Sequence, residues 1–179
     1  MKKVFICLLA ICIGYIANAQ IQTKFWGLEL SKRYTSLTAA KSIISDRCAY
    51  SRIDGNNIEA SDGTLGGYDW GTVVFNFSQD NTLYSAGFAS EHDYLYEAKN
   101  KCQQLLNSLT AKYGEPTFDR TDVTEGYVEY KTWLDESGKY YCILAIPNPT
   151  IEDTTWYVTL IYTDLELFSQ LREQQEDEL

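Results

Sequence analysis

The sequence has 179 residues but only one histidine, one methionine and three prolines, and its basic side chains are outnumbered by acidic ones. A structural zinc site takes four Cys or His ligands at tight spacing, and this chain has neither a Cys-x-x-Cys pair nor a second histidine. Its 15 Lys and Arg stand against 25 Asp and Glu and form no basic stripe, which argues against nucleic acid as a partner. We therefore expect no metal or organic cofactor and no nucleic-acid ligand.

Aromatic residues, by contrast, make up 14% of the chain, and hydrophobic residues make up 45%. This composition is too apolar for an acidic disordered chain, which cannot bury enough surface to fold. The length fits one domain with a core of its own. We therefore expect an acidic, folded protein.

The first 19 residues have the three parts of a secretory signal peptide. Two lysines follow Met1, Val4–Ile16 is apolar and uncharged, and Ala17 and Ala19 are the small residues that signal peptidase reads. The apolar run is shorter than the roughly 20 residues that span a bilayer core. We predict cleavage between Ala19 and Gln20, no transmembrane segment, and a periplasmic or secreted mature protein.

Loss of the signal peptide leaves three cysteines, Cys48, Cys102 and Cys142. An odd number in an oxidising compartment permits one disulfide and one free thiol, in any of three pairings. Alternatively, some of them are small buried hydrophobic residues, as the position of Cys102 on an apolar helix stripe indicates. The sequence leaves the disulfide state open.

The most regular pattern predicts a long helix over residues 91–113. Ser90 is a good N-cap, with Asp93 at capping-box spacing, and Gly114 and Pro116 end the helix. The apolar residues that recur every three or four positions, and so share one face, are Tyr94, Ala98, Cys102, Leu105, Leu106, Leu109 and Tyr113.

Runs rich in Tyr, Trp, Val, Ile and Thr predict strands on both sides of this helix. A hairpin precedes it over 73–88, and three strands follow it. The other expected elements are strands at 127–134, 140–146 and 155–163, an extended segment at 25–30, a short helix at 36–46, one or two strands within 49–60, a glycine-rich loop at 61–67 and a last helix at 164–174.

These elements predict an α+β fold, with an antiparallel sheet of about six strands and the helices packed on one face. Their order indicates two αβββ units, near 35–89 and 90–163, followed by a C-terminal helix. We place the signal peptide at 1–19, a single α+β domain at 20–172, and an acidic tail that frays at 173–179.

The layout resembles the small exported α+β proteins of unknown function that are common in Bacteroidota, some of which have a tandem, β-lactamase-inhibitor-like arrangement. The resemblance rests on Ala17-Asn18-Ala19-Gln20, on Phe25-Trp26-Gly27-Leu28-Glu29-Leu30 before the short helix, and on Lys112-Tyr113-Gly114-Glu115-Pro116 after the long one. The chain has Gly27 but Ser31 where a Gly-x-x-x-Gly form would place its second glycine. The resemblance implies a fold and no catalytic residue.

The sequence offers few groups for catalysis. His92 is the lone imidazole, and no nucleophile or orienting carboxylate is placed to work with it. The segment Asp62–Asp69 lacks the Gly-Lys-Ser/Thr of a P-loop and the carboxylate spacing of a calcium loop, so we interpret it as a flexible turn that leads into a hairpin. The acidic loop residues that a glycosidase-like pair would use are Asp119, Asp122, Glu125, Glu152 and Asp153.

The strands of the second half carry more aromatic rings than one core face needs. Adjacent strand residues point to opposite faces, so Tyr140 with Tyr141 cannot both pack beneath one helix layer. Tyr and Trp bury much area at a low entropic cost, so an aromatic sheet face is typical of a surface that binds a protein or a sugar. The candidate binding residues are Trp133, Tyr141, Trp156 and Tyr162.

We therefore interpret the chain as an exported, non-enzymatic binding protein whose partner is an unknown protein or glycan. A hydrolase that uses carboxylates such as Asp122 and Glu125 is one alternative, and a carrier of a small apolar ligand is another. A hydrolase gathers acids with perturbed pKa values in a pocket, a carrier encloses an apolar cavity, and a binding module exposes an aromatic patch. The oligomeric state stays open.

Overall fold

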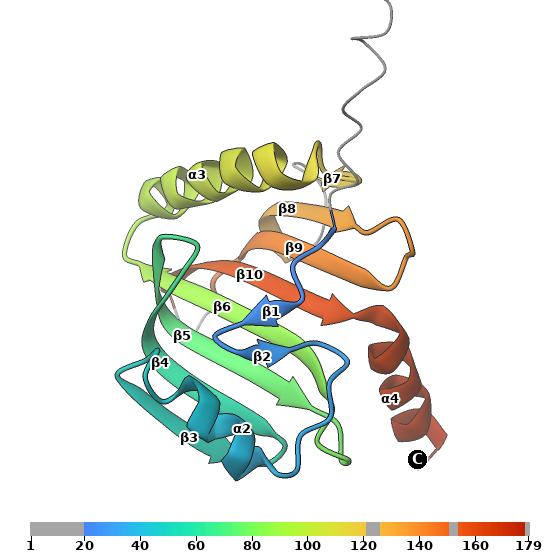
Figure 1. Cartoon of the computed structure of the whole chain (residues 1–179). Helices are drawn as coiled ribbons and strands as arrows, with labels where there is room; N and C mark the ends of the chain where they lie inside the picture. The colour runs from blue at the N-terminus through green and yellow to red at the C-terminus, as the bar shows by residue number, and fades with distance from the viewer. Residues whose placement is uncertain (1–19, 121–125, 151–153, 178–179) are drawn as a thin grey trace, which may run out of the picture.

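A computed structural model describes residues 20–120, 126–150 and 154–177 of the chain. Its main element is an eight-stranded sheet in which all neighbouring strands are antiparallel (Figure 1). From edge to edge the strands are β3 (Tyr50–Asp54), β4 (Asn57–Leu65), β5 (Tyr68–Phe77), β6 (Leu83–His92), β10 (Trp156–Asp164), β9 (Tyr140–Pro147), β8 (Tyr127–Leu134) and β7 (Phe118–Arg120). The other elements are the hairpin of β1 (Lys24–Phe25) and β2 (Leu28–Glu29) and the helices α2 (Leu37–Ile44), α3 (Leu95–Tyr113) and α4 (Leu165–Asp177).

The sheet consists of two halves with the same order of elements. In the first half α2 precedes strands β3 to β6, and in the second half α3 precedes strands β7 to β10. Each half is a meander of four neighbouring strands, and the halves join where β6 pairs with β10. The first strand of each half, β3 or β7, therefore forms an outer edge of the sheet.

This architecture confirms the predicted α+β class and the antiparallel sheet. The sheet has eight strands rather than about six, because the segment expected to hold one or two strands at 49–60 contributes two, and the short strand β7 was not predicted. β3 and β4 are separate strands that turn at Gly55 and Asn56, and β7 has only three residues. The expected glycine-rich loop is mostly strand, because Ser61–Leu65 belong to β4 and only Gly66 and Gly67 form the turn.

One face of the sheet, the core face, is covered by α2, α3 and the β1–β2 hairpin (Figure 1). Trp26 and Gly27 join β1 to β2 with φ angles of 51° and 95°, as a two-residue type I′ turn requires. This turn places Phe25, which is fully buried, with its ring centroid 5.6 Å from that of Phe88 and 4.8 Å from that of Tyr162.

The helix α3 begins later than the sequence pattern predicts. Strand β6 continues to His92, because its pairing with β10 extends as far as Trp156. The helix therefore begins at Leu95, with Tyr94 as its N-cap residue. Ser90 lies in β6, where its hydroxyl is hydrogen-bonded to the His92 imidazole at 3.1 Å instead of capping a helix.

The predicted end of α3 is confirmed. The helix ends at Tyr113, and Gly114 has a φ of 81° with its N–H donating to the Thr110 carbonyl. Its buried stripe faces β6, β9 and β10 and consists of Ala98, Cys102, Leu105, Leu109 and Tyr113.

All three described cysteines are free thiols. Cys102 and Cys142 are buried, and Cys48 is partly buried. Burial raises the pKa of Cys102 to about 12, so this thiol stays protonated and behaves as a small apolar residue.

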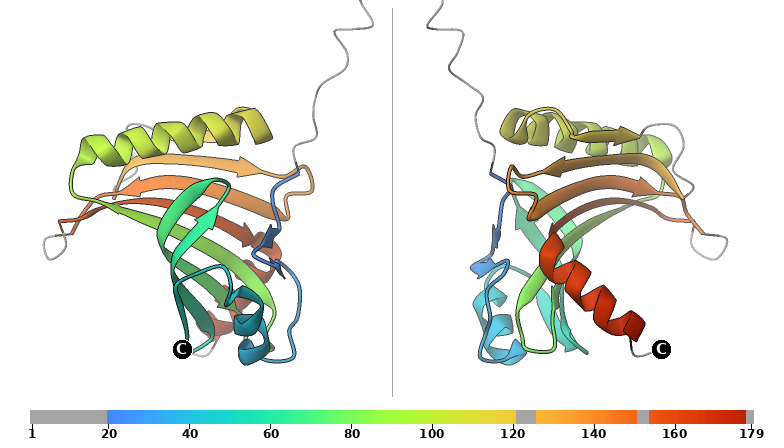
Figure 2. Two further views of the ribbon diagram at one scale, coloured as in Figure 1. Left: turned by 60° about the vertical axis from the view of Figure 1, so that its left-hand side comes forward. Right: turned by 90° about the vertical axis from the view of Figure 1, so that its right-hand side faces the viewer.

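The helix α4 packs apart from α2 and α3. It follows β10 directly and contacts β6 and β10, and its Phe168 ring lies 6.4 Å from that of Tyr84. Tyr84 has no paired residue in β5, because the β5–β6 register shifts between Asn76 and Phe77. Such an irregularity changes the direction in which a side chain points. Figure 2 shows α2 on one side of the strands and α4 running towards the other side. Among the described helices, none is long and apolar enough to span a membrane.

Candidate functional site

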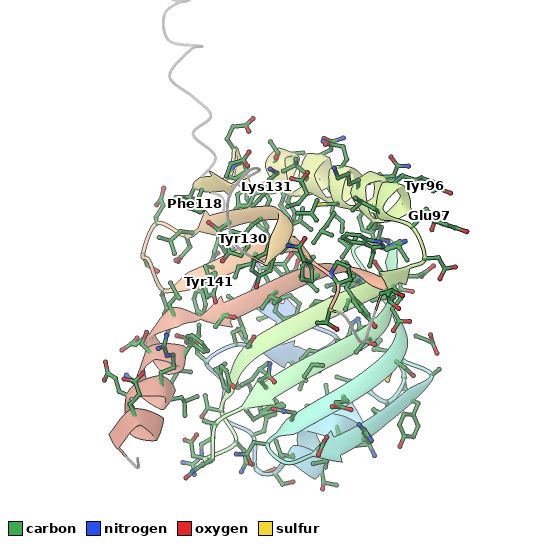
Figure 3. The ribbon with its side chains drawn as sticks, turned by 180° about the vertical axis from the view of Figure 1, so that it is seen from behind. Tyr96, Glu97, Phe118, Tyr130, Lys131 and Tyr141 are labelled. Atoms are coloured by element: carbon green, nitrogen blue, oxygen red, sulfur yellow. The ribbon has the colours of Figure 1, made fainter. Side chains whose placement is uncertain are left out.

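The face of the sheet opposite α2 and α3 has no described helix over its centre, and we call it the open face (Figure 3). Because Phe88 and Tyr162 point into the core, their strand neighbours Gly87 and Ile161 lie on the open face. Residues paired across neighbouring strands lie on the same face, so the register identifies the other residues of the open face. The residues at its centre, all partly buried, are Val74, Ala89, Thr159, Ile161, Ile143, Thr132, Tyr130 and Tyr141.

Three tyrosines, Tyr127, Tyr130 and Tyr141, form a tyrosine cluster on β8 and β9. The ring centroids of Tyr127 and Tyr130 lie 5.1 Å apart, and Figure 3 shows Tyr130 and Tyr141 next to each other on the open face. Burial is the main cause of the raised pKa of Tyr130, and Tyr141 and Tyr127 raise it further. Burial also raises the pKa of Tyr141. The phenols of Tyr130 and Tyr141 therefore stay uncharged at neutral pH and can donate hydrogen bonds to a partner.

Charged side chains lie at the edges of the open face and not at its centre. On the edge strand β3, Arg52 forms an ion pair with Glu59 of β4 at 2.6 Å and lies 3.9 Å from Asp54. Glu91 lies near the end of β6, opposite Tyr157. The residues of the centre include no Asp, Glu, Lys, Arg or His although the chain has 25 acidic residues, so a partner needs no charge to match it.

The structure places two of the four predicted binding residues in the core. Trp133 is 1% exposed, and its indole N–H donates to the Gly114 carbonyl at 2.9 Å. Tyr162 is 3% exposed and packs against Phe25. Neither ring can touch a partner on the folded protein, and this corrects their assignment to a binding face.

The other two predicted residues lie on different faces. Trp156 pairs with His92 on the core side and packs partly buried against the core. Tyr141 is on the open face, together with Tyr130 and Ile143, which the prediction omitted. Tyr141 and Ile143 flank Cys142, which is fully buried on the core face. Because side chains alternate along a strand, Tyr141 and Ile143 must therefore lie on the open face.

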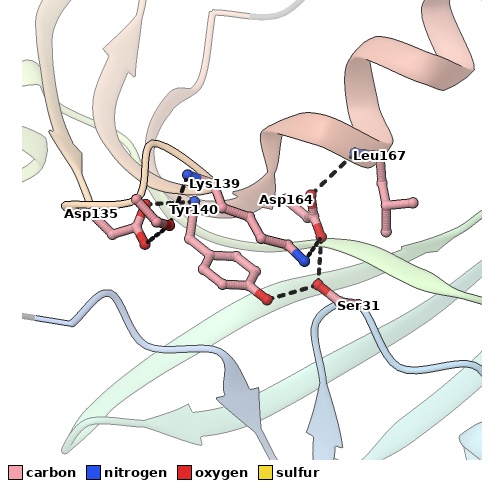
Figure 4. A network of polar contacts seen from close by, with 7 residues as sticks. Ser31, Asp135, Lys139, Tyr140, Asp164 and Leu167 are labelled. Carbon is pink, nitrogen blue, oxygen red and sulfur yellow. Dashed lines mark hydrogen bonds and ion pairs between the residues drawn. The ribbon is translucent and has the colours of Figure 1, made fainter.

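A buried polar network lies at the other end of β10 (Figure 4). Asp164 is completely buried, and one carboxylate oxygen accepts the Leu167 N–H at 3.1 Å, which caps α4. Its other oxygen accepts the Ser31 hydroxyl and lies 3.6 Å from the Lys139 ammonium. The Ser31 oxygen lies 2.8 Å from the Tyr140 hydroxyl.

The network contains residue types that nucleophilic enzymes use, but its geometry serves the fold. The Ser31 hydroxyl donates to a carboxylate that also caps a helix, and the single histidine lies at the opposite end of β6. Ser31 follows the β1–β2 hairpin with a φ of 64°. The network therefore fastens the hairpin segment to the start of α4.

Among the described residues, Asp119 and Glu129 line one hollow, and both contact the ammonium of Lys131, with Glu129 at 3.4 Å. Asp122 and Glu125, as well as Glu152 and Asp153, lie outside the described residues. Asp119 lies 2.6 Å from the ammonium of Lys131, a buried side chain on the core side of β8. The described part of the chain also holds no group of three or more His, Cys, Asp or Glu residues that could bind a metal ion.

Four hollows lie at the periphery of the described structure. They are found between α4 and the nearby turns, at the end of α3, between α3 and β8, and beside the β4–β5 hairpin. The last one is lined by Asp62, Asp69 and Glu91, which are exposed and therefore solvated. Trp70 and Trp133, each 1% exposed, fill space between the helices and the sheet where a carrier would hold its ligand.

Comparison with protein families, curated proteins and solved structures found no match to this chain. The resemblance to exported Bacteroidota proteins therefore stays a prediction. The function has to be argued from the geometry of the described residues.

Proposed function

We propose that this protein is an exported, non-enzymatic binding protein that docks a partner protein on its open face. The observation that carries this proposal is the continuous row of partly buried apolar and tyrosine side chains across the centre of the sheet. These side chains face away from the core and have no described helix above them. An uncovered apolar patch on a folded protein is a typical mark of an interaction surface.

The chemistry of the open face favours a protein over a glycan. The cores of protein interfaces are poor in charge and rich in aromatic residues, and the centre of this face combines Tyr130 and Tyr141 with Val, Ile and Thr side chains. Aliphatic groups such as Ile143 and Ile161 offer nothing to the hydroxyls of a sugar. The four hollows described above are lined by other residues than these.

The open face is also preorganised for binding. Its central strands, β6, β9 and β10, are paired on both sides, and its Val, Ile and Thr side chains have restricted rotamers. Binding of a partner therefore requires little further ordering of these side chains, so the entropic cost of binding is small. The Arg52–Glu59 ion pair at the edge would form part of a polar rim.

The two alternative functions have weaker support. A hydrolase needs two acids in one pocket, and the acids of the described hollows are either exposed, as Glu91 is, or paired with a lysine, as Asp119 is. A carrier needs an apolar cavity, and Trp70 and Trp133 fill that region with side chains.

Single substitutions in the tyrosine cluster test the proposal. Tyr130→Ala and Tyr141→Ala should each weaken binding of a discrete co-purifying protein by about tenfold, because interface tyrosines commonly contribute more than 1 kcal/mol. The matched control is Tyr96→Ala, which removes a ring that is 61% exposed on α3 (Figure 3). Affinities are measured by titration of the immobilised protein.

Unchanged far-UV circular dichroism must accompany the loss of binding. Equal losses for Tyr96→Ala and Tyr141→Ala, or full binding by all three variants, would contradict the open face as the docking surface.

Export is tested separately by mass spectrometry of the periplasmic or secreted protein. We expect its first residue to be Gln20, because Ala17 and Ala19 precede the bond that signal peptidase would cut. An intact N-terminus would refute the cleavage.

A further inference from the structure

A groove lies between α4 and the two turns that join β3 to β4 and β5 to β6, and we call it the α4 groove. Its side chains differ in chemistry from those of the open face. Its volume is about 530 Å³. Asn56 lines it from the β3–β4 turn, Asn57 from the start of β4, Gln79 from the β5–β6 turn, and Gln174 from α4. Four carboxamides from three separate segments therefore surround one space.

These four carboxamides are not used to hold the fold together. In residues 20–120, 126–150 and 154–177, none of the four side chains is hydrogen-bonded to another protein group. Each carboxamide has an N–H₂ donor beside a carbonyl acceptor. Such a pair matches neighbouring hydroxyl groups, which also donate and accept hydrogen bonds.

Two aromatic rings form an apolar wall of the same groove. Tyr84 and Phe168 both line it, with ring centroids 6.4 Å apart and an angle of 33° between the rings. Phe168 is 36% exposed, so part of its surface is open to a ligand. The negative face of an aromatic ring attracts the positively polarised C–H groups of a sugar ring.

The described lining of the groove carries little charge. None of the described residues that line it is acidic, although the chain has 25 acids, and Arg172 is the single cation among them. The guanidinium of Arg172 already has a carboxylate partner, Glu176, at 3.2 Å. Carboxamides, aromatic rings and a cation that has an acidic partner together fit an uncharged, hydroxyl-rich ligand.

We propose that the α4 groove binds a neutral oligosaccharide. The carboxamides of Asn56, Asn57, Gln79 and Gln174 bind its hydroxyl groups, and the Tyr84 and Phe168 rings pack against its apolar faces. None of these residues belongs to the centre of the open face, so this site is independent of the proposed protein-docking function.

Calorimetric titration of the mature protein with neutral hexasaccharides of glucose, xylose and N-acetylglucosamine tests this site. At least one of these probes should bind with saturable heat. Asn57→Ala and Phe168→Ala should each raise its Kd about tenfold or more, the effect of losing roughly 1.4 kcal/mol of contact. Asn57 lies outside α4, so this variant keeps the test valid if Phe168→Ala loosens the helix.

The matched controls are Asn100→Ala and Tyr96→Ala, which remove an exposed amide and an exposed ring from α3. Both should leave the Kd unchanged, and so should Tyr141→Ala on the open face. The proposal is overturned if no neutral probe binds, if the control variants weaken binding as much as the groove variants, or if only an anionic polysaccharide binds and Arg172→Gln abolishes that binding.

Discussion

At the scale of single residues, Trp133 and Tyr141 have opposite environments although both are aromatic strand residues. Trp133 lies beneath the end of α3, where it donates a hydrogen bond to Gly114. Trp133→Ala would leave a cavity and remove that bond, so we expect it to lower the free energy of unfolding by about 3–5 kcal/mol. Tyr141→Ala should cost only about 1 kcal/mol, because its ring is partly exposed.

Urea unfolding followed by circular dichroism measures both changes. Similar losses for the two variants would mean that Tyr141 is also a core residue, and the open face would lose its main ring.

His92 makes folding stability depend on pH. Burial lowers its pKa below the usual 6.5, with a smaller raising effect from Glu97 and a smaller lowering effect from Lys101. The unfolded chain therefore binds the proton at a higher pH than the folded chain does. The stabilisation is complete above about pH 6.5 and is lost as the pH falls below that value.

We expect the urea midpoint to be lower at about pH 5.5 than at about pH 7.5, and we expect His92→Gln to reduce this difference. An equal pH dependence of the native protein and the variant would contradict an influence of His92 on stability.

The sequence does not show which face of a strand points towards the core. Alternation correctly separates Tyr141 from Cys142, but it does not say which of the two points inwards. The inner face of β9 is set by α3 and by Trp133, which lies opposite Cys142 in the neighbouring strand. Such contacts between distant segments leave no local signal, so Trp133 and Tyr162 were mistaken for surface rings.

At the scale of elements, Asp164 connects the β1–β2 hairpin segment to α4. Asp164→Ala removes the cap of α4 and leaves Ser31 and Lys139 without their partner. We expect a cost of about 2–3 kcal/mol in the free energy of unfolding. Ser31→Gly should cost less, because glycine suits its φ of 64°.

Hydrogen exchange shows whether the connection is real. Amides of both α4 and the hairpin should exchange faster in Asp164→Ala, and faster exchange in α4 alone would contradict a link between the two.

The ends of elements were predictable where a local residue decides them. Gly114 ends α3 because its φ is positive, and Ser36 caps α2 through a hydrogen bond to the Ala39 N–H. The start of α3 was not predictable from the sequence, because Ser90 is compatible with both a strand and a helix N-cap. The pairing of β6 with β10 places Ser90 in the strand. The requirement for glycine at position 63 also comes from a distant segment, because a Cβ there would lie 2.2 Å from the Trp26 ring.

At the scale of the whole molecule, two αββββ halves share one sheet, and in this arrangement no described helix lies over the centre of one face. Both α2 and α3 lie on the core face, and α4 contacts only part of the other side. The class of fold followed from the sequence because strand and helix periods are local signals. The pairing of β6 with β10, which brings the open face together, depends on contacts between distant segments.

The measurement that tests the central claim most directly is site-specific photocrosslinking in the organism that makes the protein. A photoreactive phenylalanine analogue replaces Tyr141 on the open face, and in a second protein it replaces Tyr96 on α3. We predict that the Tyr141 position crosslinks to one discrete protein and that the Tyr96 position does not. Crosslinks to the same protein from Tyr96 alone, or none from Tyr141, would contradict a docking surface on the open face.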